Sequence, residues 1–267
     1  MTIMTACKKK NACDTLIVRF IDVGKGDCIV ISCGGSTVMI DAGYSSTAGS
    51  VLSQLSDTGI ERLDGLIVTH YDKDHAGGAA EIVSSIPVAA LYLPGYDSGN
   101  EQQSKLMNAA EKSGISTKKV TEDISFTLGT AVLKIYASDI EYSPGGSKGE
   151  GNDNDVSLVI SLTNGNDSFL FTGDIEKAGI KSFLKKCSSR FDVMKLPHHG
   201  RKCSNTDKLI ETVQPKTAVI TDSAEDPADK KTLSLLEDTD IYRSALCGNI
   251  MIESSGNGKY KVTSERK

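Results

Sequence analysis

The segment THYDKDH, residues 69–75, places two histidines and two aspartates within seven positions, directly after the apolar run Leu66-Ile67-Val68. In a loop that leaves a strand, His70 and Asp72 can point to one side while Asp74 and His75 point to another. Imidazole suits zinc, iron or manganese, and carboxylates add charge and can bridge two ions. One short segment could therefore serve two metal ions.

The remaining candidate ligands also follow predicted strands. His198 and His199, the only other histidines of the chain, are adjacent in KLPHHGRK; Asp41 ends STVMIDAG, and Asp174 ends SFLFTGD. Loops at the carboxyl ends of strands often converge to form sites in α/β folds. We therefore expect Asp174 to bridge both ions and one of the two adjacent histidines to complete the second set.

Each of these residues also has an ordinary structural interpretation. His70 could lie in the core, Asp72 and Asp74 in a solvated turn, and Asp174 could cap a helix. For Asp41 a structural role and the orientation of a ligand histidine are both open. The structural interpretations would have to place every histidine of the chain beside acids at strand ends by coincidence, so we favour a metal site.

The surrounding sequence alternates strands and helices. The expected strands include 15–23, 28–33, 36–43, 63–70 and 88–93, then 117–120, 124–128 and 131–136, and later 156–162, 168–174, 191–197 and 217–222, with 240–245, 249–254 and 259–264 at the end. Helices are expected near 47–59, 75–86, 98–115, 175–187, 205–213 and 230–238. We expect Gly77 and Gly78 to let the helix after the THYDKDH segment begin close to the site.

Residues 137–155 are rich in Gly, Ser, Asp and Asn and form either a lid over a site or a plain connector. We predict a flexible tail over 1–14 and a single domain over 15–267.

Composition limits the class of protein. The chain has 267 residues, 39% hydrophobic and 24% charged, with a net charge of −5, so no overall positive field attracts nucleic acid. Neither an export signal nor an apolar run long enough to span a membrane is expected. The seven cysteines form no CxxC pair, which favours reduced thiols and a cytoplasmic protein. Oligomeric state is left open.

THYDKDHAGG resembles the main motif of the metallo-β-lactamase superfamily, in the variant with aspartate as the middle ligand. Four further segments resemble the ComEC-type branch of this superfamily; in chain order they are FIDVGKGDCIVI, MIDAG, FLFTGDIE and VMKLPHHG. This branch is the hydrolase domain of bacterial DNA-uptake channels, and we expect a free-standing form of it without membrane segments. The resemblance extends from about residue 15 to the end. It implies an α/β fold: a four-layer αββα sandwich with two mixed β-sheets flanked by helices.

The resemblance also implies roles for particular residues. The implied metal ligands, for two divalent ions of zinc or manganese, are His70, Asp72, Asp74, His75, Asp174 and His199. The implied catalytic residues are Asp74 and His198, and Asp41 is expected to support a ligand. Expected contacts to substrate, ion or water are Asn154, Asp155, Arg201 and Ser204. The superfamily's third-motif histidine is missing, and Arg201 stands where the branch usually has serine.

The expected function is a metal-dependent phosphodiesterase or nuclease that acts on DNA or another phosphodiester. Lys73, Lys195, Lys202 and Arg201 are expected to steer a phosphate backbone locally. The alternatives are a hydrolase of a small phosphoester, thioester or lactone, and a metal-bound binding module without catalysis. The missing third-motif histidine and export signal argue against β-lactam hydrolysis.

Overall fold

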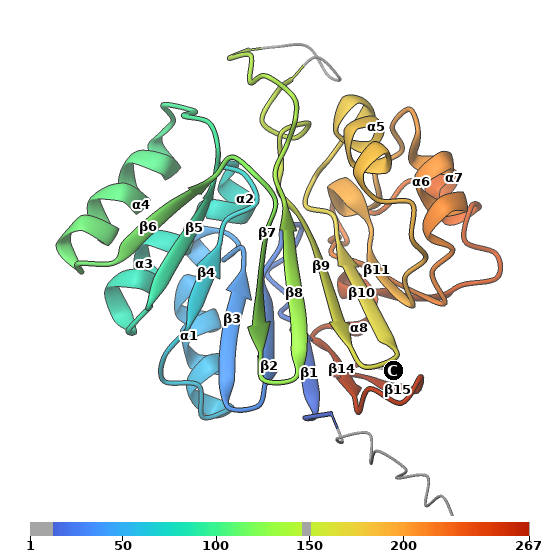
Figure 1. Ribbon diagram of the computed structural model, residues 1–267, viewed down its shortest axis with the longest axis horizontal. Helices are drawn as coiled ribbons and strands as arrows, with labels where there is room; N and C mark the ends of the chain where they lie inside the picture. The colour runs from blue at the N-terminus through green and yellow to red at the C-terminus, as the bar shows by residue number, and fades with distance from the viewer. Residues whose placement is uncertain (1–12, 146–150, 267) are drawn as a thin grey trace, which may run out of the picture.

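The protein is built on two mixed β-sheets that pack face to face, with helices on their outer faces (Figure 1). The computed structural model describes residues 13–145 and 151–266. Of the predicted flexible tail, residues 1–12 lie outside this part of the chain, as do residues 146–150 of the predicted lid or connector. The two sheets with flanking helices confirm the predicted α/β sandwich. The single-domain interpretation of 15–267 stays a prediction.

The first sheet has eight strands in the order β15-β14-β1-β2-β3-β4-β5-β6. Their bounds are Leu16–Phe20 (β1), Ile29–Cys33 (β2), Ser36–Ile40 (β3), Gly65–Ile67 (β4), Ala90–Pro94 (β5), Ser116–Val120 (β6), Ile250–Ser254 (β14) and Tyr260–Ser264 (β15). Strands β3 to β6 run parallel, so their carboxyl ends lie at one edge of the sheet.

The second sheet has seven strands in the order β13-β12-β11-β10-β9-β8-β7. Their bounds are Ile124–Leu128 (β7), Ala131–Tyr136 (β8), Val159–Asn164 (β9), Asp167–Phe171 (β10), Val193–Lys195 (β11), Thr217–Ile220 (β12) and Asp240–Arg243 (β13). Strands β10 to β13 are parallel, and they too end at a common edge.

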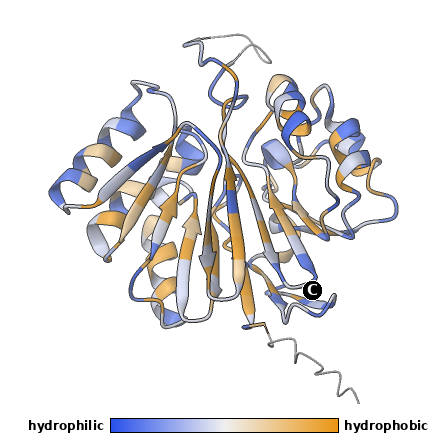
Figure 2. Ribbon diagram, viewed as in Figure 1, coloured by the Kyte–Doolittle hydropathy of each residue, from blue (hydrophilic) through white to orange (hydrophobic). Residues whose placement is uncertain are grey.

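Helices cover each sheet on the side away from the other sheet. The helices associated with the first sheet are α1 (Ala48–Asp57), α2 (Lys73–Ala76), α3 (Ala79–Ser85) and α4 (Glu101–Lys112). Those that follow strands of the second are α5 (Lys177–Lys186), α6 (Thr206–Val213), α7 (Lys230–Leu233) and α8 (Ser244–Cys247), and two short 3-10 turns are η1 (Ser45–Thr47) and η2 (Pro197–Gly200). Figure 2 shows hydrophobic residues concentrated along the strands, while the helices carry both hydrophobic and hydrophilic residues.

The central core lies between the two sheets and comes from alternating residues of their strands. In β1, Leu16, Val18 and Phe20 are buried while the residues between them are partly exposed. The rings of Phe20 and Phe171, one from each sheet, have centroids 6.1 Å apart. Burial of this interface fixes the two sheets against each other and brings their carboxyl edges together.

Most predicted strands are shorter in the structure by a few residues, as where 63–70 becomes β4 (Gly65–Ile67), and three further elements differ as follows. The helix expected over 75–86 is two helices, α2 and α3, with the Gly77-Gly78 step between them against the backbone of the 42–45 segment. A Cβ on Gly78 would collide with the Ala42 carbonyl oxygen, and one on Gly77 would collide with the Lys73 carbonyl oxygen and lie 3.0 Å from the Ser45 nitrogen. The helix expected over 230–238 ends at Leu233, and the strand expected over 240–245 ends at Arg243, where α8 begins.

Two expectations from composition concern membrane-spanning helices and the cysteines. Within the described residues no helix has both the length and the apolar character needed to cross a membrane. The six cysteines in that part of the chain are free of disulfides.

Candidate metal centre

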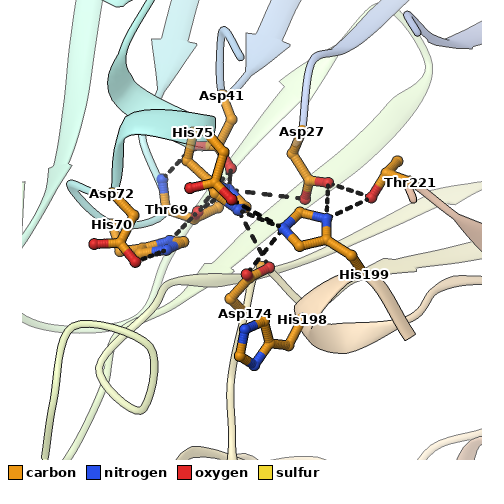
Figure 3. Close-up of polar contacts among 12 residues, drawn as sticks. Asp27, Asp41, Thr69, His70, Asp72, His75, Asp174, His198, His199 and Thr221 are labelled. Carbon is orange, nitrogen blue, oxygen red and sulfur yellow. Dashed lines mark hydrogen bonds and ion pairs between the residues drawn. The ribbon is translucent and has the colours of Figure 1, made fainter. Parts of the chain in front are cut away.

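Segments from both sheets bring the candidate ligands together where strands β3, β4, β10 and β11 end (Figure 3). Asp41 follows β3 and the THYDKDH segment follows β4, while Asp174 and the histidine pair follow β10 and β11. The structure thus brings all four sequence-predicted strand ends to one place. Parallel strands explain this convergence, since their carboxyl ends share an edge of the sheet.

His75, His199 and Asp174 form the centre of the cluster and are all buried. The Nε2 atom of His75 lies 3.3 Å from both Asp174 Oδ1 and His199 Nε2. His199 Nε2 lies 3.1 Å from Asp174 Oδ2 and 3.6 Å from Asp74 Oδ2. Asp174 therefore presents one carboxylate oxygen to each of two imidazoles.

His70 and Asp72 lie at the side of the cluster. His70 Nε2 is 3.7 Å from Asp72 Oδ2, too far for a hydrogen bond. Within the part of the chain that is described, this buried nitrogen has no hydrogen-bond partner. A buried polar atom without a partner lowers the stability of the fold. Binding of a group that accepts the lone pair or the proton of His70 Nε2 would remove this loss.

Backbone conformation separates the two adjacent histidines. His198 and His199 both have left-handed φ values, 48° and 53°, an uncommon conformation for residues other than glycine. His199 turns into the centre, where its Nδ1 lies 3.0 Å from Thr221 Oγ1. His198 turns away, and its Nδ1 lies 2.9 Å from Glu176 Oε1. The His199 side chain is 1% exposed and the His198 side chain 13%. The geometry therefore favours His199 as the ligand.

Asp41 holds the THYDKDH segment in place. Its carboxylate accepts hydrogen bonds from the Thr69 backbone N–H (2.8 Å) and hydroxyl (2.7 Å), and lies 2.7 Å from His75 Nδ1. Because carboxylate oxygens accept hydrogen bonds, the contact with Asp41 fixes a proton on His75 Nδ1 and leaves His75 Nε2 directed at the centre.

Sequence reasoning missed Asp27, which is buried beneath the cluster. Its Oδ2 lies 2.5 Å from Lys195 Nζ, and its Oδ1 accepts a hydrogen bond from the Thr221 hydroxyl (2.6 Å). Lys195 also lies 3.3 Å from Asp174 Oδ1. The available signal was an aspartate in a glycine-containing turn between two strong strands, GKGD.

Lys195 corrects one expectation. Its side chain is completely buried, and Nζ donates to the Gly173 carbonyl (3.0 Å) besides contacting the two carboxylates. An ammonium group enclosed in this way cannot steer a phosphate backbone. It serves instead as an internal positive charge beside the bridging carboxylate.

The charges of the centre reinforce one another. Burial alone would raise the pKa of Asp174, but His199, His75 and Lys195 hold it well below its usual range. Burial alone would lower the pKa of His75, but Asp174, Asp41 and Asp27 raise it well above the usual value. A concentration of carboxylates that stabilises imidazolium in this way would equally stabilise a divalent cation.

These observations fit a metal centre. Two sets of residues have ligand atoms that all lie within 4.8 Å of one another: His70, His75 and Asp174, and Asp27, His75 and His199. The donors are imidazoles and carboxylates, which suit zinc or manganese. The Nε2 atom of His70, which has no hydrogen-bond partner among the described residues, adds a further buried nitrogen that could bind an ion.

A cavity of about 370 Å³ lies next to the centre. Its lining includes four residues with an expected role toward substrate, His198, Arg201, Lys202 and Ser204. Arg201 donates a hydrogen bond to Asp226 (2.6 Å), which also lies 3.1 Å from Lys25. The guanidinium is thus anchored at the cavity wall.

Asn154 and Asp155 lie outside that lining. Asp155 is completely buried, and its Oδ1 accepts hydrogen bonds from the backbone N–H groups of Ala178 and Gly179, 2.9 Å each, at the start of α5. It thereby acts as a helix cap, and a contact of Asp155 with substrate, ion or water stays a prediction. The Asn154 carbonyl accepts a hydrogen bond from the Ser157 N–H (3.1 Å), which shapes the turn before β9.

The model of the metallo-β-lactamase superfamily matches residues 21–221. ComE operon protein 3 of Bacillus subtilis is 31% identical over 222 residues, 76% of this chain and 28% of that protein. Recombination protein 2 of Haemophilus influenzae is 28% identical over 234 residues, 86% of this chain and 27% of that protein. The chain thus spans little more than a quarter of these relatives.

Solved structures give the same fold. The metallo-β-lactamase fold protein YhfI from Bacillus subtilis superposes with a TM-score of 0.58 at 14% identity, covering 90% of this chain and 100% of that chain. A diphosphatase of the PhnP family gives 0.51 at 14% identity, covering 90% and 99%. Competence protein ComA of Neisseria gonorrhoeae is 25% identical over 203 residues, 74% of this chain and 26% of that protein. Together with ComE operon protein 3, it confirms the predicted ComEC-like resemblance. Since the family model covers most of the chain, the protein belongs to the metallo-β-lactamase superfamily.

Proposed function

We propose that this protein is a metal-dependent phosphodiesterase that cleaves DNA. The observation that carries the proposal is the convergence of six imidazole and carboxylate side chains, those of His70, Asp72, Asp74, His75, Asp174 and His199. The cavity lined by His198 adds the cationic side chains of Lys177, Arg201 and Lys202, together with the acidic Glu176 and Asp229. Two relatives whose names refer to recombination and competence, Recombination protein 2 and Competence protein ComA, support DNA as the substrate.

The six converging residues would hold two divalent ions, zinc or manganese. When bound, such ions lower the pKa of water and polarise a phosphoryl oxygen. Asp174 is the proposed bridge, because its two oxygens face different imidazoles. His70 and Asp72 would serve one ion, and Asp74, His75 and His199 the other.

Asp74 is the proposed residue that orients the attacking water. Burial would raise the pKa of its carboxyl, but His199 and His75 hold it well below the usual value, so the group is ionised at neutral pH. An ionised carboxylate can accept a hydrogen bond from water and hold it in line with the phosphorus.

His198 is the proposed donor of the leaving-group proton. It lines the cavity, and the Glu176 carboxylate 2.9 Å from its Nδ1 fixes the orientation of the ring. This leaves Nε2 as the ring nitrogen for the leaving oxygen. Arg201, Lys202 and Ser204, from the same wall, would hold the phosphate. The cytoplasmic location expected from the sequence stays a prediction.

A substrate panel tests the proposal. Metal-loaded protein is incubated with labelled single-stranded DNA, duplex DNA, a chromogenic phosphodiester and a chromogenic thioester, in parallel with Arg201→Ala. Cleavage of DNA, with a higher KM for the variant, is expected. Turnover of a small ester with intact DNA would support a small-molecule hydrolase instead, and bound metal without any turnover would support a binding module.

A further inference from the structure

Three tyrosines form a continuous aromatic stack that starts inside the THYDKDH segment. Tyr71, between His70 and Asp72, is buried, and its ring centroid lies 5.4 Å from that of Tyr96 in an edge-on arrangement of 74°. Tyr96 in turn stacks on Tyr142, with centroids 4.2 Å apart and an angle of 30°. Two ring-to-ring steps thus lead from the proposed ligands to the loop after β8.

A shared carboxylate keeps the outer two rings in register. The Tyr96 hydroxyl donates to Asp153 Oδ1 (2.6 Å), and the Tyr142 hydroxyl to Oδ2 of the same residue (3.4 Å). Both side chains remain partly exposed, unlike Tyr71. The stack is therefore already ordered at its accessible end, which lowers the entropic cost of binding a further planar group.

The two outer tyrosines also line a cavity of about 230 Å³. Its other walls include Val120 and Ile140 and the hydroxyl-bearing Thr121 and Ser138. The cavity is smaller than the roughly 300–1,000 Å³ of drug-sized ligand pockets, so it suits one planar ring system. Among the described residues, no lysine or arginine lines it and Glu141 is the one charged residue of its wall, so its chemistry favours a neutral aromatic group over a phosphate.

We propose that Tyr96 and Tyr142 form a subsite for one nucleobase of the substrate, adjacent to the cleaved phosphodiester. This inference rests on the proposed function and narrows it. A base can stack on tyrosine only after it leaves a base-paired helix, so the favoured substrate is a single strand with unstacked bases. The apolar walls and hydroxyls would contact the ring and its edge, while Arg201 and Lys202, in the other cavity, contact phosphate.

Fluorescence anisotropy on the manganese-loaded full chain tests the subsite. The two probes are a labelled single-stranded oligothymidylate and a strand of equal length with abasic tetrahydrofuran residues, both with phosphorothioate linkages that resist cleavage. The wild type is expected to bind the base-bearing strand roughly tenfold more tightly. Y142F, which keeps the ring, should retain this preference. Y142L, which keeps apolar bulk without the ring, should lose it while its affinity for the abasic strand is unchanged.

The outcomes separate the subsite from the activity. Equal affinity of the wild type for both probes, including undetectable binding of both, overturns the subsite, as does a preference retained by Y142L. Because these measurements need no cleavage, a base preference in a protein that leaves DNA intact would keep the subsite and reject the nuclease. Cleavage of DNA by a protein without base preference would do the reverse.

Discussion

Lys195 Nζ lies 2.5 Å from Asp27 Oδ2, and the two side chains are buried between the sheets beneath the candidate metal centre. The backbone N–H of Asp27 donates a hydrogen bond to the Asp74 carbonyl (3.0 Å), and the backbone carbonyl of Asp27 accepts one from the Gly43 N–H (2.8 Å). Asp27 therefore links the THYDKDH segment and the Asp41 loop of the first sheet to β11 of the second.

The first prediction concerns this ion pair. Lys195→Met should lower the free energy of unfolding by about 3–5 kcal/mol, because it leaves the Asp27 charge buried without its cation. The double variant Asp27→Asn/Lys195→Met should regain part of the loss, since the Asp27 charge is removed together with its cation. Urea unfolding of the metal-free protein measures both. A single variant within about 1 kcal/mol of the wild type would contradict the role given to the pair.

The second prediction concerns Asp41 and His75. Asp41→Asn keeps the shape of the side chain but removes the charge that holds the proton on His75 Nδ1, so metal affinity should fall about 10- to 100-fold. Competition with a chromophoric chelator measures the affinity. Asp57→Asn, at an exposed position of α1, is the matched control and should bind metal like the wild type. Unchanged affinity in the Asp41 variant would show that His75 needs no such support.

The third prediction concerns the turn that carries Asp27. A Cβ atom on Gly26 would lie 2.6 Å from the carbonyl oxygen of Asp74, so Gly26→Ala must displace the THYDKDH backbone. We expect a loss of about 1–3 kcal/mol in unfolding free energy together with weaker metal binding. Gly49→Ala is the control, because its Cβ would meet open space in α1 and should stabilise the helix by up to about 1 kcal/mol. Equal behaviour of the two variants would rule out the close approach as a constraint.

The sequence predicted the positions of most strands and the convergence of the candidate ligands, because both depend on local patterns. Apolar runs ended at Asp41, at His70 and at Asp174, and parallel strands bring such ends together. The break between α2 and α3 at Gly77 and Gly78 could not be predicted from the sequence, because the 42–45 backbone that these glycines approach lies more than thirty positions earlier.

Long-range contacts account for what the sequence could not predict. Thr221 is 194 positions from Asp27, and nothing near either residue indicates that they are hydrogen-bonded. Lys195 lies in a strand end where a lysine normally reaches solvent, and only packing of the two sheets shows that it is enclosed. The tyrosine stack likewise joins three loops whose sequences are unrelated.

The most direct test of the account is cleavage of labelled single-stranded DNA as manganese is added to metal-free protein. The predicted result is activity that rises to a plateau at two equivalents of metal per chain and is absent from Asp174→Ala at every metal concentration. A plateau at one equivalent would contradict the two-ion centre, and intact DNA with two equivalents bound would contradict the proposed phosphodiesterase.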